Sequence, residues 1–125
     1  MPDKINSFTQ LDAWKSGHKL VLAAFVCCKN MSRYDVLRNQ IERAALSITS
    51  NISEGFGRQS YADKKHFYII ARGSAYEVQN QLIVGRDLGS IKEDDFKDLA
   101  RLSLDSIKLL HGLIRSLDKQ QKANS

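Results

Sequence analysis

Proline is almost absent from this chain of 125 residues, and the only one, Pro2, lies at the N-terminus. Proline breaks helices because its ring removes a backbone donor and clashes with the preceding turn, so the chain after Pro2 is free to be helical. Long apolar runs are also missing, since none approaches the roughly 18 residues of a membrane span. The N-terminus lacks the basic-then-apolar pattern of a secretion signal. These absences predict a cytoplasmic protein with no membrane partner.

Cysteine is scarce, and the two cysteines, Cys27 and Cys28, are adjacent. On a helix neighbouring side chains diverge by about 100°, which excludes both a disulfide between them and a Cys-x-x-Cys metal clip. We interpret both as structural residues, because free cysteine commonly acts as a small buried hydrophobe. Redox sensitivity is the alternative.

Catalytic patterns are missing too. His18, His66 and His111 are isolated, without the spacing of zinc or di-iron ligands. Ser47 and Ser50 have no nearby histidine that would act as a general base. We therefore expect a protein that is not an enzyme and that uses no metal or other cofactor.

Four segments carry apolar side chains at helical spacing, over residues 9–29, 34–54, 61–88 and 92–119. Ser7 and Gln10 resemble a capping box, and Ser60 suits the start of the third segment. Gly55 and Gly89 suit left-handed ends of the second and third. Four helices joined by short loops, with no strand pattern, predict an all-α, antiparallel up-down-up-down four-helix bundle. It spans residues 1–119, followed by a disordered tail over 120–125.

Each predicted helix has one apolar stripe that we assign to the core. The stripes are Leu11, Trp14, His18, Val21, Leu22 and Phe25 in the first helix; Leu37, Ile41, Ala44, Ala45, Ile48 and Ile52 in the second; Phe67, Ala71, Ser74, Val78 and Leu82 in the third; and Phe96, Leu99, Ser103, Ser106, Leu110, Leu113 and Leu117 in the fourth. His18 is interpreted as a core or rim residue rather than a ligand.

Two helices carry a second apolar stripe, which predicts self-association. Its members are Ala13, Leu20, Ala24 and Cys27 in the first helix, and Ile69, Gly73, Tyr76 and Ile83 in the third. Soluble monomers avoid apolar patches as large as these two stripes would make in water. Gly73 supports a close contact, because glycine inside a helix costs about 1 kcal/mol relative to alanine. We therefore predict a homo-oligomer; scattered surface hydrophobics, which are common, are the alternative.

The opposite side of the second helix is small, polar and sparsely charged. It carries Arg43, Ser47, Ser50 and Glu54, with Asn51 on its flank, and it suits close contact with another surface. We predict a structural polar network of Ser47, Asn51, Glu54 and Glu77, in which Glu54 pairs with Arg58 or caps the next helix.

Formal net charge is +5, from 19 basic and 14 acidic residues, and the excess lies in the middle of the chain and in its tail. The candidate nucleic-acid-binding residues are Arg33, Arg38, Arg43, Arg58, Lys64, Lys65 and Arg72, with Tyr61, His66 and Tyr68 as candidates for base stacking. Arginine suits bidentate phosphate contact, and binding through the backbone would depend strongly on salt. An ordinary solvated basic surface is the alternative. The turn at residues 55–60 is similarly either a plain interhelical turn or a weak phosphate site at Arg58.

These residues also carry a family resemblance. The matching positions are Leu11 and Ala13–Lys15; Gln40, Ile41, Arg43–Ala45, Ser47, Ile48, Asn51, Ile52, Glu54, Gly55, Gly57 and Arg58; and Phe67, Ala71, Gly73, Ser74, Glu77, Gln81 and Leu82. In these the chain resembles the four-helix-bundle proteins encoded in intervening sequences of 23S ribosomal RNA genes. The resemblance implies an antiparallel bundle and a ring-shaped homopentamer. Related proteins serve as accessory factors to the reverse transcriptases of diversity-generating retroelements, where they bind the enzyme and nucleic acid.

The chain departs from that family pattern at Asn30–Arg33, where we expect a proline, and at Ser53, where we expect alanine. Two functional hypotheses follow. The first is a basic oligomeric protein that binds RNA or DNA by its backbone, as an accessory factor to a reverse transcriptase. The alternative is a protein-interaction scaffold that does not bind nucleic acid.

Overall fold

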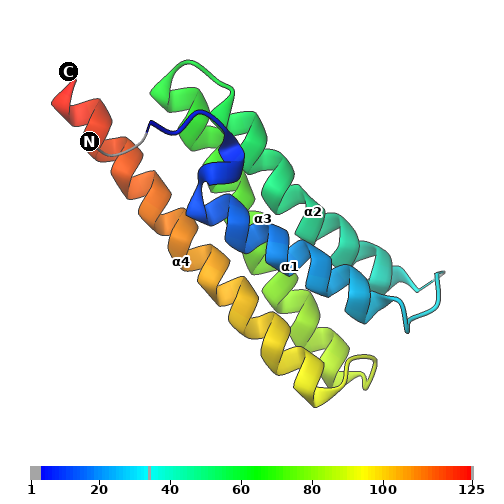
Figure 1. Cartoon of the computed structure of the whole chain (residues 1–125). Helices are drawn as coiled ribbons and strands as arrows, with labels where there is room; N and C mark the ends of the chain where they lie inside the picture. The colour runs from blue at the N-terminus through cyan, green and yellow to red at the C-terminus, as the bar shows by residue number, and fades with distance from the viewer. Residues whose placement is uncertain (1–3, 34, 125) are drawn as a thin grey trace.

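The structure is a computed structural model that describes residues 4–33 and 35–124. These residues form a short 3-10 turn and four α-helices, with no strand among them: η1 (Phe8–Gln10), α1 (Asp12–Cys28), α2 (Val36–Phe56), α3 (Tyr61–Asp87) and α4 (Glu93–Ala123). The predicted all-α four-helix bundle is confirmed (Figure 1). Tyr34, the predicted first residue of the second helix, lies outside the described residues, as do residues 1–3 and Ser125.

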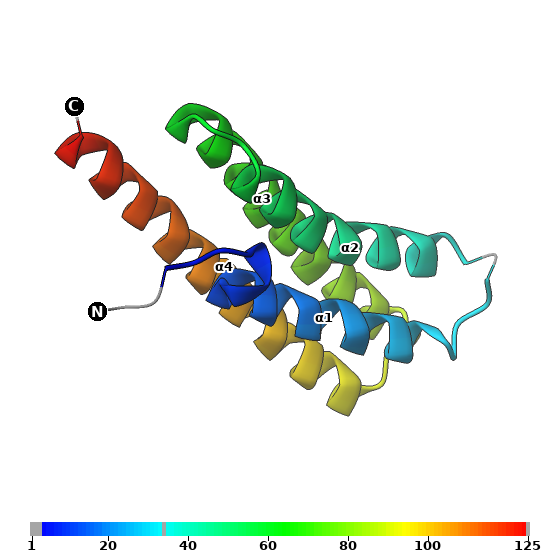
Figure 2. The same cartoon turned by 45° about the horizontal axis from the view of Figure 1, so that its top comes forward.

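Each helix packs against two of the others. α2 packs closely against α1 and α3, and α4 also packs closely against α1 and α3, whereas no Cα atom of α1 lies within 8 Å of one of α3 in the described part of the chain. α1 and α3 therefore occupy diagonal corners of the bundle. The α1–α2 and α3–α4 connections lie at one end, here called the loop end (Figures 1 and 2). The connection at residues 57–60 lies at the other end with the C-terminal part of α4, here called the turn end.

Side chains cap the helix starts largely as predicted. Ser7 and Gln10 form the predicted capping box, but it opens η1 rather than α1. The Ser60 hydroxyl accepts a hydrogen bond from the third backbone N–H of α3. The Asp35 carboxylate caps α2 by accepting from the Leu37 N–H at 2.8 Å. Such caps satisfy N–H groups that have no partner inside the helix.

The two glycines predicted to end helices behave differently. Gly89 has a φ of 78°, the left-handed conformation expected just after α3. The prediction for Gly55 is wrong, because α2 continues past it and closes at Gly57 with a right-handed φ of −77°. Gly55 is instead buried against α3, where an added Cβ would lie 2.9 Å from the Phe67 Cβ. The position requires a small residue because two helices approach closely there.

The C-terminal segment is helical rather than disordered. α4 continues to Ala123, and the Asn124 Nδ2 atom donates to the Tyr61 hydroxyl at 2.7 Å. The prediction of a disordered tail over 120–125 is therefore wrong for residues 120–124. Gln120, Gln121, Lys122 and Ala123 are all good helix formers, so the helix has no reason to stop at Lys119.

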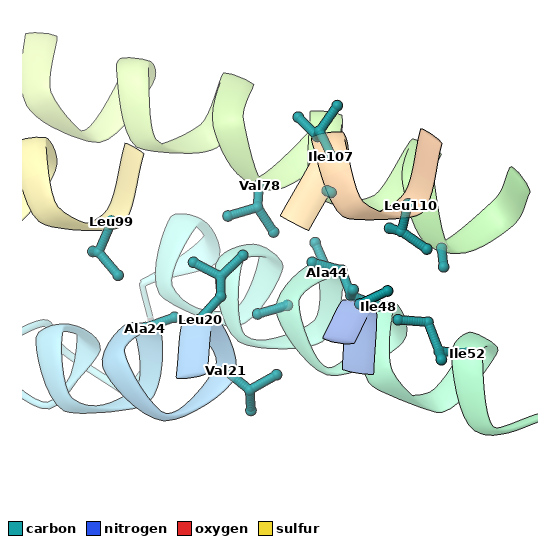
Figure 3. Packing of buried hydrophobic residues seen from close by; sticks show 14 of the residues in the cluster. Leu20, Val21, Ala24, Ala44, Ile48, Ile52, Val78, Leu99, Ile107 and Leu110 are labelled. Atoms are coloured by element: carbon teal, nitrogen blue, oxygen red, sulfur yellow. The ribbon is translucent and has the colours of Figure 1, made fainter. Parts of the chain in front are cut away.

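The core lies between all four helices. Figure 3 shows Leu20 of α1, Ile48 of α2, Val78 of α3 and Leu110 of α4 converging there, and each of the four is 0% exposed. The stripes predicted for α2, α3 and α4 face this core. Their partly buried members are Leu37, Phe67, Phe96 and Leu113, and their other members are buried.

The stripe predicted for the first helix is correct for Leu11 and Val21, which are buried, and wrong for His18, Leu22 and Phe25, because α1 turns mainly its other face inward. Its buried residues are Ala13, Gly17, Leu20, Val21, Ala24 and Cys28. Leu22 and Phe25 are 55% and 38% exposed. His18 is also exposed, and its ring stacks on Trp14 with 4.6 Å between centroids. The inward face contains Gly17, where an added Cβ would lie 3.1 Å from the Ile48 Cγ2, so close packing on α2 selected the smaller side chains.

Candidate nucleic-acid and assembly surfaces

The residues of α1 that we predicted for a subunit interface are buried inside the protomer. Ala13, Leu20 and Ala24 are 3%, 0% and 0% exposed, because they fill the protomer's own core. Cys27 is partly buried beside them. Placing Ala13, Leu20 and Ala24 in a subunit contact was therefore wrong, for the same reason that the core stripe of this helix was misassigned.

The predicted residues on α3 do lie at the surface. Ile69, Tyr76 and Ile83 are 40%, 49% and 41% exposed and, with Gly73, share one side of the helix. A Cβ added at Gly73 would meet nothing within 4 Å. We call these four residues the α3 face. Its glycine has no structural role within the protomer that would offset the cost of glycine in a helix.

Sequence reasoning missed a second exposed apolar surface, which lies on α1. Leu22, Phe25 and Val26 are 55%, 38% and 63% exposed, and we call them the α1 face. Phe25 also lines a shallow groove against α2 with Arg43 and Leu46, and Leu46 is 50% exposed. The signal was the four-residue spacing of Ala13 and Gly17, which marks the small, closely packed side of α1 and leaves the larger apolar residues outside.

Several of the predicted nucleic-acid-binding residues hold contacts within the protomer. The Arg38 Nη1 atom donates to the Met31 carbonyl at 2.8 Å, and its Nε lies 3.4 Å from the Glu42 carboxylate. The Arg72 Nη1 atom lies 3.1 Å from the His111 Nδ1 and so links α3 to α4. Both arginines are partly buried, and their main role in the protomer is to join segments of the bundle.

Arg58, Lys64 and Lys65 lie together at the turn end. Arg58 pairs with Glu54 at 2.7 Å and covers the Phe67 ring at 4.7 Å. The Lys64 Nζ atom donates to the Phe56 carbonyl at 2.7 Å. Lys65 pairs across to α4, with 3.0 Å between its Nζ and the Asp118 carboxylate. The Arg58 and Lys65 side chains remain 44% and 40% exposed, so their ion pairs are open to exchange with another anion.

Arg33 and Arg43 are exposed, and their side chains make no hydrogen bond or ion pair within the described part of the chain. Arg33 lies at the loop end, whereas Arg43 lies on the outer side of α2. The predicted set therefore does not form one patch. Among the stacking candidates, Tyr68 is buried at 3% exposure, so its proposed role is wrong, while His66 is exposed and Tyr61 partly buried.

Two of the four predicted network residues are joined. The Asn51 Nδ2 atom donates to the Ser47 Oγ at 2.9 Å, and Ser47 is hydrogen-bonded to Ser74 of α3 at 2.9 Å. Glu54 pairs with Arg58, as predicted, and Glu77 accepts from the Gln81 Nε2 at 3.4 Å, so neither is joined to Ser47 and Asn51. Ser74 was missed because it occupies a core stripe, where its hydroxyl signals a polar partner on the neighbouring helix.

Both cysteine thiols lose a proton less readily than an ordinary thiol. Burial raises the pKa of the Cys28 thiol to about 12, with the neighbouring Cys27 adding to the shift. Burial also raises the pKa of Cys27.

Within the residues described, no cluster of three or more histidine, cysteine or acidic side chains is arranged to hold a metal. No helix in the same part of the chain has both the length and the apolar character needed to span a membrane. That the protein is not an enzyme stays a prediction.

Comparison with known proteins identifies the relatives of this bundle. Residues 9–112 match the model of the 23S rRNA-intervening sequence protein family. Among solved structures, the chain is similar to a protein of unknown function from the S23 ribosomal protein family of Bacteroides thetaiotaomicron. The TM-score is 0.77 at 25% sequence identity, over 82% of this chain and 97% of that one. No curated protein gives a significant match. The family match extends over most of the four helices, and the chain belongs to the 23S rRNA-intervening sequence protein family.

Proposed function

We propose that this protein is a non-enzymatic, oligomeric protein that binds RNA or DNA through the sugar-phosphate backbone. The main support is the uneven charge along the bundle. At the turn end, Arg58, Lys64 and Lys65 lie beside the basic C-terminal part of α4, to which Lys65 is joined through Asp118. At the loop end, the first turn of α4 carries Glu93, Asp94 and Asp95. A polyanion is therefore attracted to one end of the protomer.

The contacts at the turn end also suit phosphate. Arg58 and Lys65 are held by exposed ion pairs, which contribute little to stability and are easily exchanged. His66 is exposed next to them and offers a ring to a base. Binding of this kind is dominated by displaced counterions, so its affinity should fall steeply with added salt.

Assembly is the second part of the proposal. We propose that the protomer is an antiparallel up-down-up-down bundle and that the α1 face of one copy docks on the α3 face of the next. The two faces belong to helices at diagonal corners, so each copy has two different contact surfaces. Such head-to-tail contacts close into rings when the rotation between copies is suitable. A ring-shaped homopentamer, as the resemblance implies, would repeat the basic end around its axis and strengthen its field.

The test is light scattering on the purified full chain, with and without a structured RNA, at low and high salt. We expect a ring-sized oligomer that gains RNA mass at low salt and loses it at high salt. The double variant Arg58→Glu/Lys65→Glu should keep the oligomer and lose most of the RNA. An oligomer that ignores both RNA and DNA at every salt concentration would refute the nucleic-acid part, and a monomer would refute the assembly part.

A protein-interaction scaffold is the second candidate, and the two exposed apolar faces favour it. The small polar side of α2, with Arg43 and Ser50 exposed, adds a third surface for a partner. The resemblance suggests a reverse transcriptase as that partner. On this alternative, charge reversal at Arg43 would change assembly or capture of the enzyme, while affinity for nucleic acid would be negligible with and without the substitution.

A further inference from the structure

One side of α4 carries a row of five basic residues, here called the basic ridge, which is separate from the residues predicted from the sequence. Lys97, Arg101, Lys108, Arg115 and Lys119 follow one another at steps of four and seven residues and are all exposed. At 100° per residue these steps keep all five side chains within a narrow arc of the helix. At 1.5 Å per residue the ridge is about 33 Å long.

The ridge is available for a ligand. None of its five side chains makes a hydrogen bond or ion pair within the described part of the chain, in contrast to Arg38, Arg58 and Arg72. Gly112 lies beside it, and a Cβ added there would meet only the Arg115 guanidinium, at 3.9 Å. The basic side chains of the ridge therefore have no partner in the described part of the chain, and Gly112 adds no side chain that would block access to the middle of the ridge.

The surfaces on either side of the ridge carry charges of both signs, including basic groups. Toward α1, Lys108 shares a groove with Lys15 and Lys19, and Asp12 and Asp105 also line that groove. Toward α3, the Arg72–His111 contact lies next to the ridge. The acidic residues of α4 lie in its first turn or on its sides rather than along the line of the five basic residues.

We infer that this ridge docks a double-stranded nucleic acid along its phosphates, independently of base sequence. The inference rests on the proposed function and names its ligand class and surface. The length of the ridge is about that of one turn of a duplex, which is roughly 34 Å. The phosphates of a duplex lie on two strands that wind about its axis, so a row of cations about one turn long crosses the backbones of both strands.

The composition of the ridge favours a duplex over a single strand. Proteins that hold single strands use aromatic side chains on which bases stack, and no phenylalanine, tyrosine or tryptophan lies among the five basic residues. The His111 ring beside them is already in contact with Arg72. The exposed large apolar side chains in this part of α4 are Leu104, which lies within the row, and Leu109, which lies to its side. Without stacking, affinity depends on charge density, and a duplex has about one charge per 1.7 Å of its axis.

The test measures fluorescence anisotropy of the full chain with labelled 20-base-pair RNA and DNA duplexes and with an unstructured single strand of equal length, over a salt series. The test variant is Arg101→Glu/Lys108→Glu. The matched control is Lys29→Glu/Lys92→Glu, which changes net charge equally at exposed loop-end positions, Lys92 being the N-cap of α4 and outside the arc of the ridge. Circular dichroism checks that both variants fold.

We expect tighter binding to duplex than to single strand. The ridge variant should lose at least tenfold in duplex affinity, and its salt slope should fall by about two, since each lost phosphate contact removes about one. The control should stay within about twofold. Equal losses of duplex affinity in both variants, or tighter binding to the single strand, would refute duplex docking on the ridge while leaving the proposal of nucleic-acid binding intact. Failure of the unmodified chain to bind any of the three ligands at low salt would instead refute the proposed function.

Discussion

Ser47 of α2 and Ser74 of α3 face each other with 2.9 Å between their hydroxyl oxygens, at a place where the helices are otherwise packed by apolar side chains. Asn51 donates to the same Ser47 oxygen at 2.9 Å, and either serine hydroxyl can be the donor in the bond between Ser47 and Ser74. A small polar chain thus crosses the α2–α3 contact. Ser74 is only 7% exposed, so water does not readily replace a lost partner.

Ser74→Ala should therefore lower the free energy of unfolding by about 1 kcal/mol, the usual contribution of one buried hydrogen bond. Urea denaturation monitored by circular dichroism measures the change. Ser50→Ala is the control, because Ser50 is exposed on the same side of α2 and its loss should stay within about 0.5 kcal/mol. Equal effects of the two substitutions would show that the serine pair adds no stability.

Gly55→Ala should destabilise the bundle by about 1–2 kcal/mol. The new methyl group would lie 2.9 Å from the Phe67 Cβ and from the Tyr68 ring, and such overpacking outweighs the gain in helix propensity. Gly57→Ala is the matched control, since its nearest neighbours would be backbone oxygens at 3.6 Å or more. Thermal and urea denaturation compare the two, and a harmless Gly55→Ala would contradict the close approach of α2 and α3.

The fold could be predicted from the sequence because all four helices carry apolar side chains at helical spacing, and the stripes assigned to the core were correct for α2, α3 and α4. The same reasoning failed for α1, because its two stripes are equally apolar. Only the close packing of α1 against α2 at Gly17 decides which stripe faces inward. The end of α2 was misplaced because glycine was interpreted as a stop signal when its size was what mattered. The sequence identifies each basic residue but not its partners. Arg38 and Arg72 are held by tertiary contacts, which the periodicity of the sequence does not reveal.

Gly73→Ala should separate protomer stability from assembly. A Cβ at Gly73 meets nothing within the protomer, so alanine should stabilise the isolated bundle by up to about 1 kcal/mol. If the α3 face docks on another copy, the same methyl group should weaken that contact. Sedimentation and urea denaturation at low protein concentration measure the two effects.

Gly112→Ala is the matched control for Gly73→Ala. It lies within α4, and its added Cβ would have only the Arg115 side chain nearby, at 3.9 Å. It should give a similar gain in stability with no change in oligomer size. A Gly73→Ala variant that assembles as well as the Gly112→Ala variant would remove Gly73 from the interface.

The stability of the bundle should fall in alkaline solution because of Cys28. Burial raises the pKa of its thiol from an ordinary value of 9.0 to about 12, so the folded state keeps a proton that the unfolded state releases. The contribution is fully present below pH 9 and is lost progressively as the pH rises from there toward 12. By pH 10 the loss should be about 1 kcal/mol.

Urea denaturation under reducing conditions at pH 7 and pH 10 measures this loss of stability. Cys28→Ala lowers stability at both pH values by leaving a small cavity, but it should reduce the difference between them. Tyr68, whose pKa burial also raises, contributes equally to both proteins and cancels from the comparison. An unchanged difference in the variant would show that the buried thiol does not link folding to pH.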